Sequence, residues 1–241
     1  MTATPRTVAV VPLRDCVSGK SRLATALAPP ARRRLVATLA RHVVGVLAAT
    51  VDHVVVVTAD EPFTRATLGL DADRRGSSGS ARQSGLPTGP RTAAQIAAVT
   101  VVAQPPERPG LNAALDVGRE RAVALDADRV LVAHADLPLL APDDVAAVLA
   151  ADARPDQVVV ATDRHGAGTN LLLVPTTAPF QFRFGVGSRA AHVAEAGRIG
   201  LPSVVVQRPG TAVDLDTIDD WDELPGAVRD RLREDVGLPL L

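Results

Sequence analysis

The chain has 241 residues, 46% of them hydrophobic, with 26 basic and 27 acidic side chains and a formal net charge of −1. This balance, with four Phe, one Trp and no Tyr, argues against nucleic-acid binding, which uses basic faces and stacking rings. No apolar run approaches the roughly 20 residues of a membrane span, and the N-terminus lacks a secretory signal. The single cysteine, Cys16, excludes an internal disulfide. We expect a globular, cytoplasmic protein with no membrane partner.

Lysine is almost absent from the chain. Of the 26 basic residues, Lys20 is the only lysine. A composition rich in Arg, Ala and Val accounts for the bias, and under such a bias a lysine that persists merits inspection. Its compact ammonium on a flexible stem differs chemically from the planar guanidinium of arginine.

Strands and helices alternate along the predicted chain. Val-rich apolar runs predict buried strands, and apolar residues at helical spacing predict helices. In order, the predicted elements are strand 7–13, helix 29–49, strand 53–58, helix 62–70, strand 100–103, helix 111–125, strand 129–133, helix 142–151, strands 157–161 and 170–174, helix 188–199, strand 203–206 and a last amphipathic helix between 218 and 236.

This alternation predicts an α/β fold, with a mostly parallel sheet and helices on both faces. We expect a single domain over residues 1–241. Residues 73–95 are rich in Gly, Ser, Arg and Pro and predict a flexible insertion. Ligands bind at the carboxyl ends of parallel strands, so the loops of interest begin at Arg14, Asp60, His134, Asp163 and Asp214.

The loop after the first strand concentrates positive charge. Arg14, Lys20 and Arg22 lie within nine residues, together with Gly19. Cationic side chains and free backbone N–H groups suit a polyphosphate, although Arg14 stands where a GxxxxGK[ST] phosphate loop has its first glycine. The alternative interpretation is a solvated surface loop.

Carboxylates follow two of the later strands. Asp136 comes after an apolar strand, where it could hold Mg²⁺, or cap a turn instead. Asp214 and Asp216 share a face if the segment is extended, so both could point at one cation. Alternatively, Asp216 or Thr217 caps the last helix. One residue could cap while the other binds metal.

Two glycine-rich loops are candidate anion contacts. Two glycines precede Thr169, and Gly185 and Gly187 lead into the helix that begins at Ser188; backbone of this kind can approach an anion closely. Between the loops, three phenylalanines in 180–184 would share one face of a strand, as core residues do. The five histidines show no metal-ligand spacing, and no Ser-centred nucleophile motif is present.

Six motifs, each weak alone, occur in register. They are Val11–Pro12 followed by Lys20–Leu23, Gly110–Leu115, Ala135–Leu140, Gly168–Asn170, Phe184–Ser188 and Asp214–Thr217. Together they resemble the guanylyltransferases of deazaflavin coenzyme (coenzyme F-420) biosynthesis, called 2-phospho-L-lactate guanylyltransferases in archaea and phosphoenolpyruvate guanylyltransferases in actinobacteria. The likeness runs from about Thr7 to Glu223 and fails only across the insertion.

The resemblance implies the nucleotidyltransferase fold shared with molybdenum-cofactor guanylyltransferases and sugar-nucleotide enzymes. It also implies roles for particular residues. Lys20 and Arg22 would be catalytic and grip the GTP triphosphate; Asp136, Asp214 and Asp216 would bind Mg²⁺; Thr169, Gly185 and Ser188 would hold the small acceptor; and Pro12, Arg14, Asp60, Gly110 and Asn112 would complete the GTP site. The family often has a second lysine where this chain has Arg14.

The reaction implied is transfer of GMP from GTP to the phosphate of phosphoenolpyruvate, in which the acceptor oxygen attacks the α-phosphorus and pyrophosphate leaves. The alternatives are 2-phospho-L-lactate or 3-phosphoglycerate as acceptor, or a nucleotidyltransferase of molybdenum-cofactor or sugar-nucleotide type. A non-catalytic nucleotide-binding module is disfavoured because Lys20, Asp136, Asp214 and Asp216 are all present. The sequence leaves homo-oligomer formation open.

Overall fold

The computed structural model describes residues 4–13, 23, 27–70, 97–152, 154 and 156–237. The predicted phosphate loop, with Arg14, Lys20 and Arg22, lies outside the described residues, and so does the predicted insertion at 73–95. No helix in the described ranges is long and apolar enough to cross a membrane.

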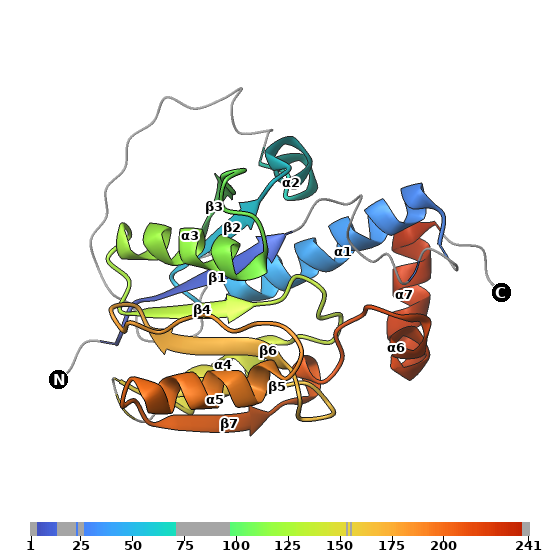
Figure 1. Ribbon diagram of the computed structural model, residues 1–241. Coiled ribbons are helices and arrows are strands. Elements are labelled where there is room, and N and C mark those ends of the chain that lie inside the picture. Colours follow the sequence, from blue (N-terminus) through green and yellow to red (C-terminus); the bar gives the residue numbers. More distant parts are fainter. Residues whose placement is uncertain are drawn as a thin grey trace.

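Seven strands form one sheet with helices on both sides (Figure 1). The strand order is β3-β2-β1-β4-β6-β5-β7, and only β6 runs antiparallel to its neighbours, so the prediction of a mostly parallel α/β sheet is confirmed. The strands are β1 (Thr7–Leu13), β2 (His53–Thr58), β3 (Ala98–Ala103), β4 (Arg129–Ala133), β5 (Val158–Thr162), β6 (Thr169–Pro175) and β7 (Ser203–Gln207).

The described helices lie close to their predicted positions. They are α1 (Pro29–Ala48), α2 (Glu61–Thr67), α3 (Leu111–Val123), α4 (Pro142–Ala150), α5 (Ser188–Arg198), α6 (Ile218–Glu223) and α7 (Gly226–Val236), with a short 3-10 turn at Pro209–Thr211. Several begin where the sequence limits the backbone. Pro residues occupy the first turns of α1, α2 and α4, positions that tolerate the missing N–H.

Each face of the sheet packs against its own pair of helices. Alternate residues of β1 point to opposite sides: Val11 joins a cluster with α1 and α4, whereas Val10 joins a cluster with α3 and α5. Both faces of the central strands are therefore buried, which explains their continuous apolar sequences. A third cluster lies between α1 and the C-terminal helices and contains Leu215 and Trp221.

Two predictions are corrected. The last helix is not continuous but breaks into α6 and α7 at Leu224, whose backbone is extended (φ −67°, ψ 142°). The following Pro225 disfavours helical backbone at the residue before it. Residues 180–184 do not form a strand, although Phe180, Phe182 and Phe184 are buried as core residues, as expected.

Gly118 in α3 lies against β1 and tests how tightly the helix packs. A Cβ atom there would overlap the Val10 side chain and approach Val57 Cγ2 at 3.2 Å. We expect Gly118→Ala to lower the free energy of unfolding by about 1–3 kcal/mol through overpacking. Gly45→Ala is the matched control, because Gly45 lies in α1 with open space around its Cβ position. This substitution should raise the free energy of unfolding by about 0.5–1 kcal/mol. Equal changes in the free energy of unfolding of the two variants, measured by urea denaturation, would contradict close packing at Gly118.

Candidate active site

The order of the strands locates a crevice. β1 pairs with β2 on one side and with β4 on the other, so the direction of the chain along the sheet reverses at β1. In open α/β sheets, ligands bind beside the carboxyl ends of the strands at such a reversal. Here the ends are Leu13 of β1 and Ala133 of β4.

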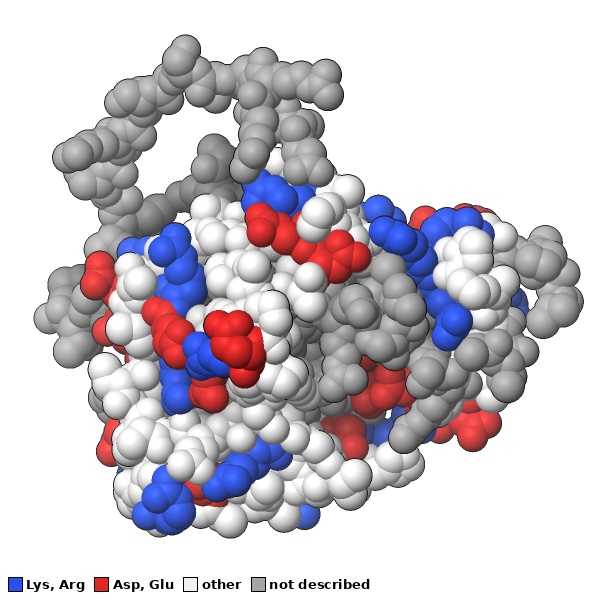
Figure 2. Space-filling model, turned by 45° about the horizontal axis from the view of Figure 1, so that its top comes forward, with Lys and Arg blue, Asp and Glu red and all other residues white. Residues whose placement is uncertain are grey.

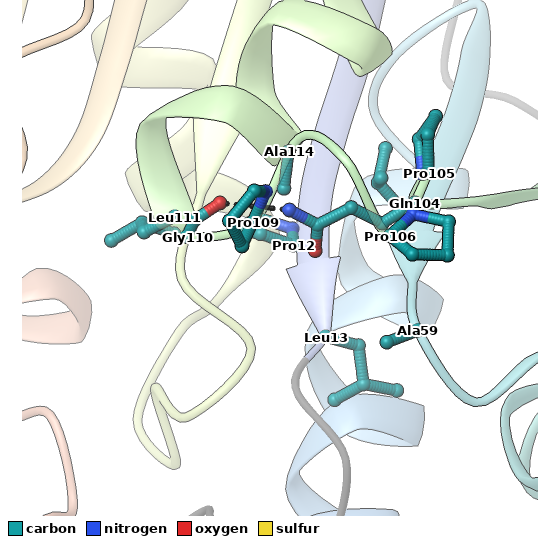
Figure 3. Close-up of a pocket in the computed structure, with 11 residues that line it drawn as sticks. Pro12, Leu13, Ala59, Gln104, Pro105, Pro106, Pro109, Gly110, Leu111 and Ala114 are labelled. Atoms are coloured by element: carbon teal, nitrogen blue, oxygen red, sulfur yellow. Dashed lines mark hydrogen bonds between the residues drawn. The ribbon is translucent and has the colours of Figure 1, made fainter.

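A pocket of about 440 Å³ opens on the β2–β3 side of this reversal (Figure 3). Two of the residues predicted to bind GTP, Pro12 and Gly110, lie together in its wall. Gly110 precedes α3 with a φ of 94°, a conformation that glycine adopts readily. The described residues that line it are Pro12, Leu13, Val57, Ala59, Gln104, Pro105, Pro106, Pro109, Gly110, Leu111 and Ala114.

Gln104 is the polar side chain of this pocket, and its amide has a fixed orientation. Its Nε2 donates to the carbonyl oxygens of Arg108 (2.6 Å) and Gly110 (2.9 Å). Because carbonyls only accept, the nitrogen must face them, and the oxygen remains as an acceptor on the other side. In Figure 3 this oxygen points away from Gly110. Sequence analysis did not select Gln104, although it directly follows β3 at the ligand edge.

The other two described residues that were predicted to bind GTP, Asp60 and Asn112, make hydrogen bonds within the protein. Asp60 is the N-cap of α2, where its carboxylate accepts from Phe63 N–H at 3.1 Å. The Asn112 amide makes a reciprocal pair with Phe184: Phe184 N–H donates to Oδ1 at 2.9 Å, and Nδ2 donates to Phe184 O at 3.1 Å. Asn112 therefore joins the start of α3, beside the pocket, to the loop before α5.

The predicted metal-binding loops meet on the β4 side of the reversal. Leu215 N–H donates to Asp136 O at 3.0 Å, and Leu215 itself is fully buried in the third cluster. The apolar side chain thus anchors the loop and leaves Asp214 and Asp216 on either side of it. Burial, and then the negative charge of Asp136, raises the pKa of Asp214.

The segment from Asp214 to Asp216 is not extended, however. Asp216 N–H donates to Asp214 O at 3.1 Å, so the chain turns at Leu215, and the alternation that would place both carboxylates on one face does not apply. Within the described ranges, no three His, Cys, Asp or Glu side chains are grouped closely enough to hold a metal ion. Mg²⁺ commonly takes only one or two carboxylates and completes its shell with water and substrate phosphate.

Asp220, in the first turn of α6, organises this loop. Its Oδ2 accepts from Asp216 N–H (3.0 Å), Thr217 N–H (2.7 Å) and the Thr217 hydroxyl (2.8 Å), while Oδ1 accepts from Arg164 Nη2 (2.9 Å). Burial alone would raise the pKa of Asp220, but the hydrogen bonds from Thr217 and Arg164 outweigh it and lower the pKa. Thr217 is the helix N-cap, so the capping interpretation is confirmed for Thr217.

The glycine-rich loop before Thr169 is shaped by a second carboxylate. Asp163 accepts from the N–H groups of Ala167 and Gly168, each at 2.9 Å. A Cβ on Gly168 would lie 2.6 Å from the Asp163 Oδ2, so a larger residue there would displace the carboxylate that accepts these hydrogen bonds. The loop is also joined to the start of α5, because Arg189 N–H donates to Ala167 O at 3.1 Å.

The segment between Phe180 and Phe184 is held by side chains instead of by neighbouring strands. Besides the Asn112 pair at Phe184, Gln181 N–H donates to Glu195 (2.9 Å), and Arg183 N–H donates to His192 Nε2 (3.0 Å). Glu195 also pairs with Arg198 at 2.7 Å, and this hydrogen-bonded pair lowers the pKa of Glu195 to about 2. Polar groups of α3 and α5 thereby set the path of the chain into Gly185.

Thr169 and Ser188 are both buried, and His192 contacts Thr169 from the helix that Ser188 begins. The Thr169 hydroxyl is 3.0 Å from His192 Nδ1, and Ser188 is one turn before His192 on α5. Gly185 has a φ of 142° and precedes Ser188, whose N–H donates to Gly185 O. The predicted acceptor residues are therefore neighbours in the structure. His192 was missed because we searched the histidines for metal-ligand spacing, whereas the useful signal was its i, i+4 position after Ser188.

Charge on the surface is mixed. On the face drawn in Figure 2, blue basic and red acidic side chains are interspersed among the described residues and do not form a broad basic field. This arrangement agrees with the balanced composition of 26 basic and 27 acidic side chains.

Asp220→Asn tests whether the Asp220 carboxylate holds the loop that carries Asp216 and Thr217. The amide that replaces the carboxylate must turn its NH₂ group either towards Arg164 or towards the N–H groups of Asp216 and Thr217, leaving donors unpaired. We expect a loss of about 1–3 kcal/mol in the free energy of unfolding, measured by urea denaturation. Asp219→Asn is the control, because Asp219 is the exposed neighbour in the same helical turn and should change stability by less than about 0.5 kcal/mol. Equal losses would contradict the role assigned to Asp220.

Comparison with known proteins places the chain among guanylyl transferases. The model of the family described as "Guanylyl transferase CofC like" matches residues 92–226. Phosphoenolpyruvate guanylyltransferase of Sphaerobacter thermophilus is 35% identical over 223 residues, covering 91% of this chain and 93% of that protein. 2-Phospho-L-lactate guanylyltransferase of Methanothermobacter thermautotrophicus is 28% identical over 219 residues, covering 91% and 84%.

Solved structures confirm the fold. A candidate nucleotide-diphospho-sugar transferase of Desulfovibrio desulfuricans superposes with a TM-score of 0.65 at 15% identity and covers 96% of each chain. A mannosyltransferase of Pyrobaculum calidifontis, solved with GDP-mannose and Mn²⁺, has a TM-score of 0.50 at 17% identity and covers 86% of this chain and 57% of that one. The predicted nucleotidyltransferase-type architecture is therefore present. The family match and the extent of the similarity to the Sphaerobacter protein show that this chain belongs to the CofC-like guanylyl transferase family.

Proposed function

We propose that the protein transfers GMP from GTP to phosphoenolpyruvate, giving enolpyruvoyl-diphospho-guanosine and pyrophosphate in coenzyme F-420 biosynthesis. The observation that carries the proposal is the division of the site at β1. A pocket large enough for a nucleoside opens over β2 and β3, and carboxylates and glycine-rich loops gather beyond β4. We place the reaction in the cytoplasm, where GTP is made.

The pocket over β2 and β3 would take the guanosine. Its walls are mainly proline and aliphatic side chains, which suit the faces of a base and a ribose. The fixed amide oxygen of Gln104 is an acceptor for the N1–H and 2-amino groups of guanine. In the sequence, the predicted triphosphate loop with Arg14, Lys20 and Arg22 directly follows β1, whose last residues Pro12 and Leu13 line this pocket. Its cations are the groups proposed to bind the phosphates.

One or two of the carboxylates of Asp136, Asp214 and Asp216 would hold Mg²⁺, because the three are not grouped closely enough to bind one ion together. Their oxygens are the donors that Mg²⁺ prefers, and burial beside another carboxylate, which raises the pKa of Asp214, is a cost that a cation would relieve. When bound, Mg²⁺ supplies neutralisation of phosphate charge. Asp220 and Leu215 fix the backbone that carries Asp214 and Asp216.

The acceptor would bind where Thr169, Gly185 and Ser188 meet. One oxygen of its phosphate attacks the α-phosphorus of GTP, a new P–O bond forms, and the bond to the β-phosphate oxygen breaks to release pyrophosphate. The attacking oxygen of the acceptor phosphate is already ionised at neutral pH, so no general base is required. Catalysis is then positioning and charge neutralisation, with Lys20 and Arg22 as the proposed catalytic cations.

A pyrophosphate-release assay tests the reaction. We expect turnover with purified protein, Mg²⁺, GTP and phosphoenolpyruvate, and slower or no turnover when 2-phospho-L-lactate, 3-phosphoglycerate or ATP replaces a substrate. Asp136→Asn should lower kcat by about 100-fold or more, whereas Asp143→Asn, on the exposed first turn of α4, should leave it within about twofold. Absence of release with every acceptor, or full activity of Asp136→Asn, would contradict the proposal.

Guanine selection by Gln104 is tested by comparing kcat/KM for GTP with kcat/KM for ITP. ITP lacks the 2-amino group of GTP, so the wild-type protein should prefer GTP. Gln104→Ala should narrow the GTP-to-ITP ratio of kcat/KM by about fivefold, the effect of one hydrogen bond. Loss of support for the 108–110 turn lowers both values together and cancels in the ratio. An unchanged ratio would remove Gln104 from base recognition.

A further inference from the structure

We propose that His192 is a positioning residue for the acceptor site: its Nδ1–H donates to the Thr169 hydroxyl, so that the Thr169 O–H proton is directed to an oxygen of the bound phospho-acid. This inference rests on the proposed function, because it needs an anionic acceptor beside Thr169, Gly185 and Ser188. It concerns a residue that acts through Thr169 and does not touch the substrate itself.

The tautomer of His192 follows from its two neighbours. Arg183 N–H lies 3.0 Å from Nε2, and a backbone N–H can only donate, so Nε2 carries no proton. A neutral imidazole then has its proton on Nδ1, which lies 3.0 Å from Thr169 Oγ1. The Thr169 oxygen is therefore the acceptor in this contact, and its own proton remains available for another partner.

The surroundings of His192 keep it neutral. The residue is fully buried, with the Phe184 ring centroid at 4.6 Å and the Phe180 centroid at 5.9 Å. Burial lowers the pKa of His192 to about 4; the charge of His134 acts in the same direction, and that of Glu195 opposes it. Across the neutral pH range His192 therefore offers one donor and one acceptor, both already in use.

Thr169 lies where the reaction would occur. It begins β6, which is antiparallel to β4 with Leu171 opposite Ala133, and His134 N–H donates to Asn170 O at 3.2 Å. Thr169, one residue before Asn170, therefore lies at the edge of the sheet where β4 ends and the segment with Asp136 begins. A proton donor at this point would face an acceptor phosphate or carboxylate held near the metal-binding loops.

The His192 imidazole also fixes the path of the backbone into the glycine-containing loop before α5, which begins at Gly185. Its Nε2 holds Arg183 N–H, two residues before Gly185, while Asn112 holds both backbone groups of Phe184. His192 thus connects the two sides of the acceptor site, Thr169 on β6 and Gly185 before α5. The two contacts use different ring nitrogens, so they can be removed separately.

Two substitutions separate the contacts. In His192→Gln the side-chain oxygen can take the place of Nε2 and accept from Arg183 N–H, but the donor to Thr169 is lost. In His192→Asn the amide nitrogen can take the place of Nδ1 and donate to Thr169, but the acceptor for Arg183 is lost. Thr169→Val removes the hydroxyl with little change of shape, and Thr169→Ser retains it as the conservative control.

Steady-state kinetics should show a selective effect on the acceptor. We expect His192→Gln and Thr169→Val each to raise KM for phosphoenolpyruvate about 10-fold, with KM for GTP within about twofold. The double variant should be no worse than Thr169→Val alone, because both changes remove one interaction. His192→Asn and Thr169→Ser should retain a lower acceptor KM than His192→Gln. The inference would be overturned if the effects of His192→Gln and Thr169→Val on KM for phosphoenolpyruvate multiplied in the double variant. An equal rise in KM for GTP and for phosphoenolpyruvate would also overturn it.

Nitrogen-15 spectra of the histidine-labelled wild-type protein test the tautomer without turnover. A protonated Nδ1 and an unprotonated Nε2 on His192 at pH 7 are expected, and a protonated Nε2 would overturn the inference even in an active enzyme. If the wild-type protein releases no pyrophosphate with any acceptor, the proposed function fails. Calorimetric titration with inorganic phosphate then decides the inference: weaker binding by His192→Gln than by His192→Asn supports it, and equal binding overturns it.

Discussion

The reversed direction of β6 is the constraint on which the site depends. In a wholly parallel sheet, the ligand edge receives only the ends of strands and the loops that follow. Because β6 runs antiparallel between β4 and β5, its first residues, Thr169 and Asn170, lie at that edge beside the end of β4. The acceptor side of the site is therefore built on a rigid strand as well as on loops, and Leu171 to Val174 hold this strand in the core.

Around this strand, irregular backbone is held by polar side chains, of which Asp220 and His192 are buried. Asp163 receives two N–H groups of the glycine-rich loop, Asp220 receives two of the metal-binding loop, and Asn112 and His192 receive neighbouring N–H groups before Gly185. Buried backbone groups without partners are costly, so each side chain both stabilises a loop and selects its path. This arrangement preorganises the site without a strand or helix at every position.

Much of the architecture follows from the sequence because its signals are local. Continuous Val-rich runs fix the strands, and Pro at helix starts fixes several boundaries. The clustering of Thr169, Gly185 and Ser188 also agrees with the motifs. The direction of β6 is not local, since it depends on the short connection from β5, and the turn at Leu215 depends on a buried contact with a distant cluster. Gln104, Asp220 and His192 contact irregular backbone 3 to 9 residues away, and the spacings of helices and strands do not predict the path of such backbone.

The division of polar chemistry across the reversal has an electrostatic consequence. The β4 side carries carboxylates close enough for Asp136 to raise the pKa of Asp214, so alone it would repel both a triphosphate and a phospho-acid. The anions can approach only if cations balance these carboxylates. A divalent ion would reverse the sign locally, and the cations predicted in the loop after β1 would add to this neutralisation. A neutral His192 fits the same scheme, because it directs a hydroxyl donor to the acceptor without adding a charge that depends on pH.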